Sequence, residues 1–293
     1  MFMKRQQSLS VLMLIIIILL SIFVGCASNE VETIQKQPLN TVDPAVPSPS
    51  CDPNISEVFA PKINVDKVLS AKIPIFMYHS ISEKIFDTRY PENFFRPKIL
   101  ELDIKFLRDK KYDAIFISDF DNIGAFKRPV ALTFDDGYKN FYKVAYPLLK
   151  KYKIKATLYV ITGKVGEKGR CTWADLIEME ASGFVSVESH SVNHLAMSSL
   201  SNAMTKAELS ESKAQIEKRL NKKVVSFCYP AGEFNSMTVE LAGSYYAFAL
   251  DKHGGVYDIL EHDRYIIPRI RMSRNYGLKF FEEECKYGEV VLK

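Results

Sequence analysis

The sequence shows no strong excess of charge of either sign. Its 39 Lys and Arg residues against 35 Asp and Glu residues give a formal net charge of +4. Lys4 and Arg5 lie in a segment that we predict to be removed, which leaves 37 against 35, or +2. This balance lacks the basic surface typical of nucleic-acid binding, so we expect no nucleic-acid partner.

Cysteine is scarce, and no internal repeat is present. The five residues Cys26, Cys51, Cys171, Cys228 and Cys285 match no zinc-ribbon spacing. Pairing in an oxidising compartment stays open, but we expect free, partly buried thiols. Hydrophobic residues make up 47% and charged residues 25%, which is typical of a globular chain with one large or two small domains.

The only long apolar run lies at the N-terminus. Residues 1–5 are basic and residues 9–24 are almost entirely apolar, which predicts an export signal over 1–25. Phe23-Val24-Gly25-Cys26 resembles a bacterial lipoprotein cleavage box, which implies lipidation of Cys26. An uncleaved membrane anchor and a fully released protein are the alternatives. All three interpretations place the folded part outside the cytoplasm. The lipidated form and the uncleaved anchor would also attach it to the membrane.

Two further segments follow the signal. Residues 26–70 are rich in Pro, Ser, Asn and Thr without apolar periodicity, which predicts a flexible tether. Residues 71–293 alternate short apolar runs with segments of helical period, which predicts one parallel α/β domain, either a barrel or a doubly wound sheet. The expected strands are 73–78, 114–117, 130–134, 156–161, 184–187, 224–229, 246–250 and 266–270, and the expected helices are 97–110, 138–152, 173–182, 203–220 and 236–243.

An acidic pair follows one expected strand in Thr133-Phe134-Asp135-Asp136-Gly137. Two adjacent carboxylates at a strand end suit a division in which one binds a metal and the other takes a proton from water. The alternative is a plain turn that caps the next helix.

Two histidines follow another expected strand in Ser189-His190-Ser191-Val192-Asn193-His194. Their spacing allows both imidazoles to reach one ion, and Asp136 would complete an open catalytic set for zinc or another divalent transition metal.

Two more motifs end strands. His79, in Phe76-Met77-Tyr78-His79-Ser80, suits protonation of a leaving amine, although a lone His is often structural. The turn at Tyr229-Pro230-Ala231-Gly232 could aim a backbone N–H at an oxyanion, although it also fits an ordinary turn.

Together these motifs resemble the polysaccharide deacetylases, also called the NodB-homology domain or carbohydrate esterase family four. The acidic and histidine motifs lie 54 residues apart (190 minus 136), and the similarity covers residues 73–278. The Met-Tyr-His opening resembles the poly-N-acetylglucosamine deacetylase subgroup, in which the motif order is circularly shifted. The resemblance implies a distorted (β/α)7 barrel.

The resemblance also assigns roles. It implies that Asp136, His190 and His194 bind the metal, that Asp135 is the general base and that His79 is the general acid. The backbone N–H of Ala231 would stabilise the oxyanion.

The sequence departs from the family pattern at the fourth motif. Cys228 occupies the place of an Arg that orients the base, and Arg269 is a candidate substitute, with an ordinary salt bridge as the alternative. Tyr229 and Trp173 could line the sugar groove or belong to the core. His253 and His262 match no motif and are expected on the surface.

We therefore expect a metal-dependent N-deacetylase, a monomer, acting on N-acetylglucosamine-containing exopolysaccharide or peptidoglycan. An O-acetyl esterase and a glycan-binding lipoprotein without turnover are the alternatives.

Overall fold

The structure is a computed structural model that describes residues 68–292. The chain divides into two units, 1–51 and 52–293, and every described residue belongs to the second. The signal segment, Cys26, Cys51 and residues 26–67 of the predicted tether lie outside the described part. Within residues 68–292, no helix combines the length and apolar character needed to cross a bilayer.

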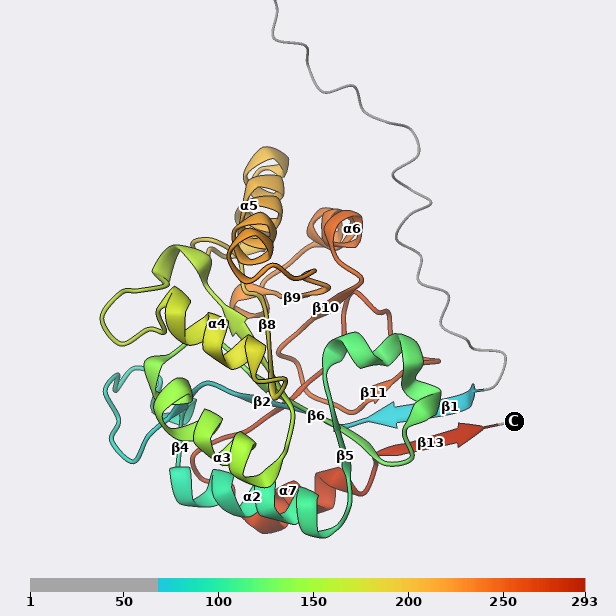
Figure 1. Cartoon of the computed structure of the whole chain (residues 1–293). Helices are drawn as coiled ribbons and strands as arrows, with labels where there is room; N and C mark the ends of the chain where they lie inside the picture. The colour runs from blue at the N-terminus through green and yellow to red at the C-terminus, as the bar shows by residue number, and fades with distance from the viewer. Residues whose placement is uncertain (1–67, 293) are drawn as a thin grey trace, which may run out of the picture. The chain divides into compact units, whose positions relative to one another are not determined.

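Among the described residues, seven parallel strands form a curled sheet (Figure 1). Their order is β10 (Phe248–Leu250), β9 (Ser226–Cys228), β8 (Val185–Ser189), β7 (Ala156–Val160), β6 (Pro129–Phe134), β2 (Ile75–Tyr78) and β12 (Ile270–Arg271). The segment before β12 also pairs with β10, because the Ile267 N–H donates to the Ala249 carbonyl at 3.0 Å. This pairing joins the two ends of the sheet and confirms the distorted (β/α)7 barrel. A further short strand, β5 (Asp113–Ile115), pairs with β6.

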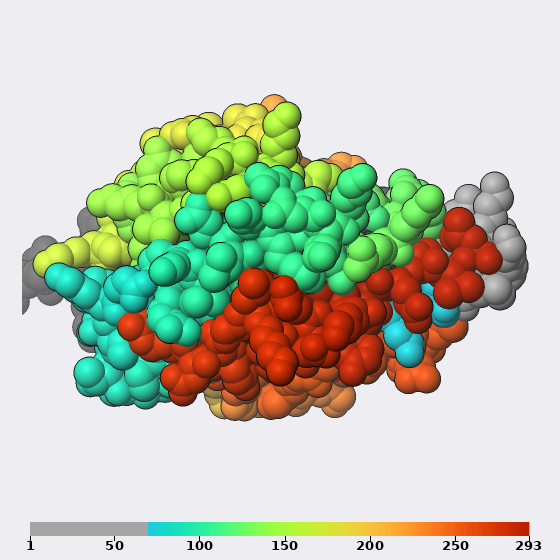
Figure 2. All heavy atoms as spheres, turned by 90° about the horizontal axis from the view of Figure 1, so that it is seen from below, coloured from blue at the N-terminus to red at the C-terminus, as the bar shows by residue number. Residues whose placement is uncertain are grey.

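Helices surround the sheet, and local capping sets where several begin. They are α2 (Pro97–Asp109), α3 (Tyr146–Tyr152), α4 (Trp173–Ala181), α5 (Asn202–Leu220), α6 (Ser236–Tyr245) and α7 (Leu278–Cys285). Side chains of Thr172, Ser201 and Asn235 cap α4, α5 and α6. Figure 2 shows α2 and α7 side by side on one face, where the rings of Phe106 and Phe281 meet edge to face at 6.2 Å.

Prolines explain two differences from the predicted elements. The strand expected over 73–78 is two strands, β1 (Val68–Ile73) and β2, separated by Pro74. The helix expected over 138–152 begins as a π turn, Phe141–Ala145, before α3. Pro147, at the second position of α3, has no N–H to donate, so the regular helical bonds cannot run through it.

The sequence patterns missed a small antiparallel sheet. It joins β1 to β11 (Tyr257–Asp258) and β13 (Glu289–Leu292), and β1 starts at Val68, three residues before the predicted domain start at residue 71. These strands are short and have weak periodicity. Their pairing therefore depends on contacts between residues far apart in the chain.

The barrel strands carry two apolar layers on opposite faces. On β6, Leu132 and Phe134 belong to the larger core, which includes the covering helices, whereas Ala131 belongs to a second cluster inside the barrel. This alternation follows from the two-residue period of a strand. It also decides which residues at the strand ends face the barrel interior.

Candidate active site

Three strands and the segment before β12 each deliver one polar side chain to the same end of the barrel. The inward row of β6 runs through Ala131 and Thr133, and the next inward position is Asp135. By the same two-residue step, β2 leads to His79, β8 leads to His190, and Ile267 leads to Arg269. Because the barrel strands are parallel, these residues meet at the carboxyl edge of the sheet.

A left-handed turn separates the roles of the two adjacent acids. Asp135 continues the inward row, and its N–H donates to the Tyr78 carbonyl at 2.9 Å. Asp136 and Gly137 then adopt φ values of 74° and 66°. A Cβ on Gly137 would lie 3.2 Å from Val160 Cγ1, so both φ and space favour glycine. Neither carboxylate caps the next helical turn, whose N-cap is Asn140, which argues against the capping alternative.

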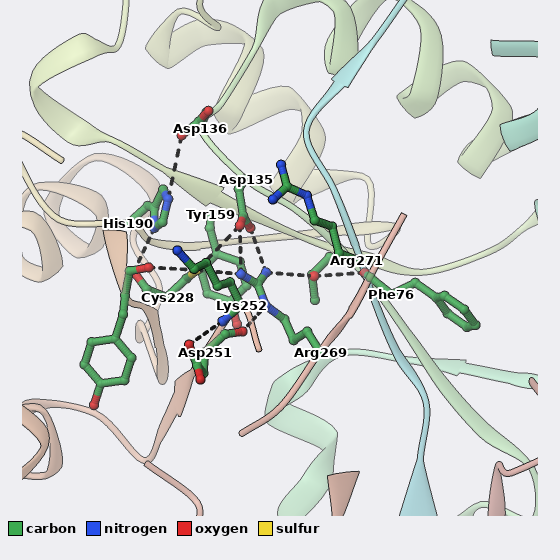
Figure 3. A network of polar contacts seen from close by, with 12 residues as sticks. Phe76, Asp135, Asp136, Tyr159, His190, Cys228, Asp251, Lys252, Arg269 and Arg271 are labelled. Atoms are coloured by element: carbon green, nitrogen blue, oxygen red, sulfur yellow. Dashed lines mark hydrogen bonds and ion pairs between the residues drawn. The ribbon is translucent and has the colours of Figure 1, made fainter. Parts of the chain in front are cut away.

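Asp135 forms a buried bidentate ion pair with Arg269 (Figure 3). The two guanidinium NH groups donate to Oδ1 and Oδ2, each at 2.8 Å, and the side chains are only 1% and 3% exposed. Arg269 Nε also donates to the Asp251 carbonyl at 2.8 Å. Burial acts to raise the pKa of Asp135, but the charge and hydrogen bonds of Arg269 outweigh it and hold the pKa well below its usual value. Asp135 is therefore a carboxylate at neutral pH.

Arg269 reaches the base across Cys228. One guanidinium NH lies 3.0 Å from Cys228 Sγ, and the sulfur lies 3.6 Å from Asp135 Oδ2. Arg269, in the segment just before β12, therefore contacts the base as the arginine expected at position 228 would. This is the substitution that the sequence suggested.

Asp136, His190 and His194 converge as a metal-binding set. Asp136 Oδ1 lies 3.7 Å from His190 Nε2 and 3.5 Å from His194 Nε2. His190 Nδ1 lies 2.7 Å from the Cys228 carbonyl, which accepts a hydrogen bond from the Nδ1–H and so leaves the Nε2 lone pair directed at Asp136. Burial lowers the pKa of His190, and burial followed by the charge of His190 lowers that of His194 to about 4. Neutral imidazoles beside an ionised carboxylate fit a divalent transition metal.

A second group of potential ligands, Asp135, His190 and Cys228, also lies close together. Arg269 already occupies both oxygens of Asp135, and burial raises the pKa of the Cys228 thiol. This group therefore suits a metal less well than the Asp136 set.

Helix α5 holds the loop that carries the two histidines. The buried Glu208 carboxylate accepts the N–H groups of Val192 and Asn193, each at 2.9 Å, and the Asn193 side-chain amide at 2.6 Å. Ser191 and His194 have φ values of 65° and 60°. These conformations are costly for L-residues, so the loop needs such an anchor. Sequence reasoning missed Glu208, because nothing in its local pattern marks it.

A cavity of about 490 Å³ opens over these groups and is lined by His79, Asp135, Asp136, His190, His194, Ala231 and Arg269. Burial lowers the pKa of His79, while the carboxylates of Asp135 and Asp136 act in the opposite direction. Ala231 is exposed on the cavity wall and has φ 54° and ψ 10°. A left-handed alanine is uncommon and accords with a functional turn. The structure thus brings together every residue assigned to the metal, the base, the acid and the oxyanion.

Of the two aromatic residues considered for the sugar groove, Tyr229 lines the cavity although it is almost fully buried, and Trp173 belongs to the core. The Tyr229 side chain is 1% exposed, and its hydroxyl donates to the Tyr265 carbonyl at 3.0 Å. Trp173 packs against the larger core and under the Arg219 guanidinium, away from the cavity lining. Tyr90, which sequence reasoning did not single out, is the exposed aromatic residue on the cavity wall.

The remaining expectations concern isolated residues. His253 and His262 are exposed, as predicted. The described cysteines, Cys171, Cys228 and Cys285, are free but fully buried, where partial burial was expected.

Comparisons with known proteins identify similar sequences and a similar fold. The sequence profile of the polysaccharide deacetylase family matches residues 124–246. The chain is 34% identical over 177 residues to YxkH of Bacillus subtilis (strain 168), which is named as a polysaccharide deacetylase; the match covers 59% of this chain and 61% of that protein. It is 32% identical over 195 residues to a poly-beta-1,6-N-acetyl-D-glucosamine N-deacetylase of Staphylococcus aureus (strain MSSA476), covering 59% of this chain and 66% of that enzyme. Each match spans less than two thirds of the relative's length.

Among solved structures, the fold is similar to the Streptococcus pyogenes deacetylase PplD in complex with acetate. The TM-score is 0.69 at 28% identity, and the superposition covers 74% of this chain and 99% of that chain.

Proposed function

Because this chain belongs to the polysaccharide deacetylase family, we propose that it is a metal-dependent N-deacetylase. Its substrate would be an N-acetylglucosamine-containing polysaccharide, either an exopolysaccharide or peptidoglycan, and its products acetate and a free amine. The name of the staphylococcal relative supports the N-acetylglucosamine polymer, and the acetate in PplD accords with the proposed product.

One observation carries the proposal. A carboxylate held ionised by Arg269 lies beside an Asp–His–His ligand set, and both face a cavity that His79 also lines. Amide hydrolysis needs a base for water, a charge that stabilises the oxyanion and an acid for the amine. Each requirement has a residue here.

Asp136, His190 and His194 would hold the metal, with zinc as the first candidate. When bound, a divalent ion supplies Lewis-acid polarisation of the acetyl carbonyl and lowers the pKa of water. Asp135 takes the proton from the attacking water, because each oxygen keeps a lone pair beside its bond to Arg269. The Ala231 N–H stabilises the developing oxyanion, and the protonated form of His79 delivers its proton to the leaving nitrogen.

We further propose that the enzyme works outside the cytoplasm, attached to the membrane through Cys26 or an uncleaved anchor. The support is the N-terminal sequence alone: a basic start, an apolar run and Gly25-Cys26.

The test is acetate release by the zinc-loaded full chain from poly-N-acetylglucosamine and from purified peptidoglycan. We expect release from one polymer, loss of release on chelation, and loss in Asp135→Asn. An O-acetylated glycan serves as the ester control. Zinc binding without acetate release from either N-acetylated polymer would contradict the proposal.

A further inference from the structure

The charges that line the cavity are unequal in number. Outside the metal set and the Asp135–Arg269 pair, the acids are Asp87 and Glu92, and the bases are Arg89, Lys164, Arg170, Lys252 and Arg271. The bases therefore exceed the acids by three charges. A cavity lined mainly by one sign attracts the opposite sign.

Most of these charges already have a partner. Asp87 pairs with Arg89 at 2.8 Å, and Glu92 pairs with Arg271 at 3.3 Å. Arg170 donates to the Asp136 carbonyl at 2.6 Å. The negative charges of Asp87 and Glu92 are thus balanced by neighbouring arginines on the cavity wall.

Lys164 and Lys252 are different. Within residues 68–292, neither ammonium forms an ion pair or a hydrogen bond, although both side chains are partly buried at the cavity wall. The stem of Lys252 crosses Gly232 so closely that a Cβ there would lie 2.5 Å from Lys252 Cγ. Packing of this kind restricts where the ammonium can go, and Figure 3 shows Lys252 beside Cys228 and Asp251.

The two lysines flank the reacting groups. Lys164 ends the short helical turn that follows β7 and lines the same cavity as His194. Lys252 follows β10. In the sheet, β8 and β9 lie between β7 and β10. His190 directly follows β8, and Ala231 lies in the turn after β9. A sugar whose acetyl group lies between His190 and Ala231 would therefore place its neighbouring substituents near the ammonium group of Lys164, of Lys252 or of both.

We propose that Lys164 and Lys252 are specificity residues for an anionic glycan, one that carries a carboxylate or phosphate next to the N-acetyl group. This inference rests on the proposed deacetylation and narrows its substrate. A neutral homopolymer fits less well, because each deacetylation leaves an amine that becomes positively charged. The lysines would then repel the product and discourage further reaction on the same chain.

The test uses three matched β-1,4-linked N-acetylglucosamine oligomers: unmodified, oxidised to a carboxylate at C6, and phosphorylated at C6. With the zinc-loaded full chain, the Kd comes from ligand-observed NMR and kcat/KM from acetate release, each at low and high salt. Lys164→Gln and Lys252→Gln are compared with Lys206→Gln, which removes an exposed lysine on α5 far from the cavity lining.

We expect the anionic oligomers to bind more tightly at low salt, by about fivefold per lysine, because a partly screened ion pair contributes on this scale. The preference should shrink at high salt and in both cavity variants, and persist in Lys206→Gln. The carboxylate and phosphate arms identify which anion is preferred.

Measuring both binding and acetate release distinguishes a failure of the charge inference from a failure of the proposed deacetylation. Equal binding of neutral and anionic oligomers, or a preference unchanged in both lysine variants, overturns the charge inference whether or not acetate is released. An anionic binding preference without acetate release supports the charge inference and overturns the proposed deacetylation.

Discussion

The Asp135–Arg269 pair predicts a strong energetic coupling between the two side chains. Asp135→Asn leaves the Arg269 charge at 1% exposure with no counter-charge, and Arg269→Met leaves the carboxylate equally isolated. Breaking a buried ion pair from one side costs about 3–5 kcal/mol of unfolding free energy, because the remaining charge stays desolvated. The double variant removes both charges, so it should cost clearly less than the sum of the single changes.

Besides its weak bond to the Cys228 sulfur, Arg269 makes two other hydrogen bonds, and these set the residual cost of the double variant. Met cannot replace its donations to the Asp251 carbonyl and to Thr133 Oγ1. Each unmade bond costs about 1 kcal/mol, so we expect the double variant to remain about 2 kcal/mol below wild type. The coupling free energy should then be about 4 kcal/mol or more.

Urea unfolding of the metal-free full chain gives the four free energies, and acetate release gives the activity of each zinc-loaded protein. Asp121→Asn is the matched control, because its pair with Arg264 has a similar length of 3.0 Å but side chains 32% and 23% exposed. We expect that change to cost about 1 kcal/mol or less. Activity should be absent in every variant that lacks Asp135, even where stability returns.

Additive single and double changes, or a cost for Asp135→Asn no larger than that for Asp121→Asn, would refute this reasoning. Either result would mean that the pair is not a buried, mutually dependent unit. It would also remove the basis for assigning Arg269 the task of orienting the base.

Three further predictions concern the surroundings of the site. Glu208→Gln should weaken zinc affinity by about 10–100-fold, because second-shell anchors act on this scale, whereas Glu211→Gln on the exposed face of α5 should not; competitive zinc titration measures both. Asp103 is buried on α2 beside the Tyr78 hydroxyl, and burial raises the pKa of its carboxyl to about 8. The stability that the protonated carboxyl contributes is therefore fully present below about pH 4 and is lost as the pH rises toward 8. Asp103→Asn should therefore be more stable than wild type at pH 8, by about 3 kcal/mol in urea unfolding, and a difference that does not grow with pH would contradict this. Gly137→Ala should destabilise the protein by about 1–3 kcal/mol and abolish acetate release, while Gly166→Ala, with φ 92° and no atom near its Cβ, should incur only the backbone cost and keep its activity.

The local patterns predicted much of the barrel. The strand around Val130–Phe134 and the helix over Pro97–Asp109 were found almost to the residue, because an apolar run and an amphipathic period are encoded over short distances. The sheet of β1, β11 and β13 was missed, because its pairing joins Val68 to Leu292. No local window contains both partners.

The same distinction applies to the site. By itself, the sequence determined the acidic pair, the two histidines and His79, because each motif follows a strand. The two-residue period sends His79, Asp135 and His190 inward, whereas turns with positive φ place Asp136 and His194. The contact between Asp135 and Arg269 spans 134 residues, and only the closed barrel decides it. The anchor at Glu208, the core placement of Trp173, and the ammonium groups of Lys164 and Lys252, which have no partner within residues 68–292, were likewise decided by packing. The physical reason is that local periodicity fixes the direction of a side chain, whereas its partner and its burial depend on which distant segments the fold brings against it.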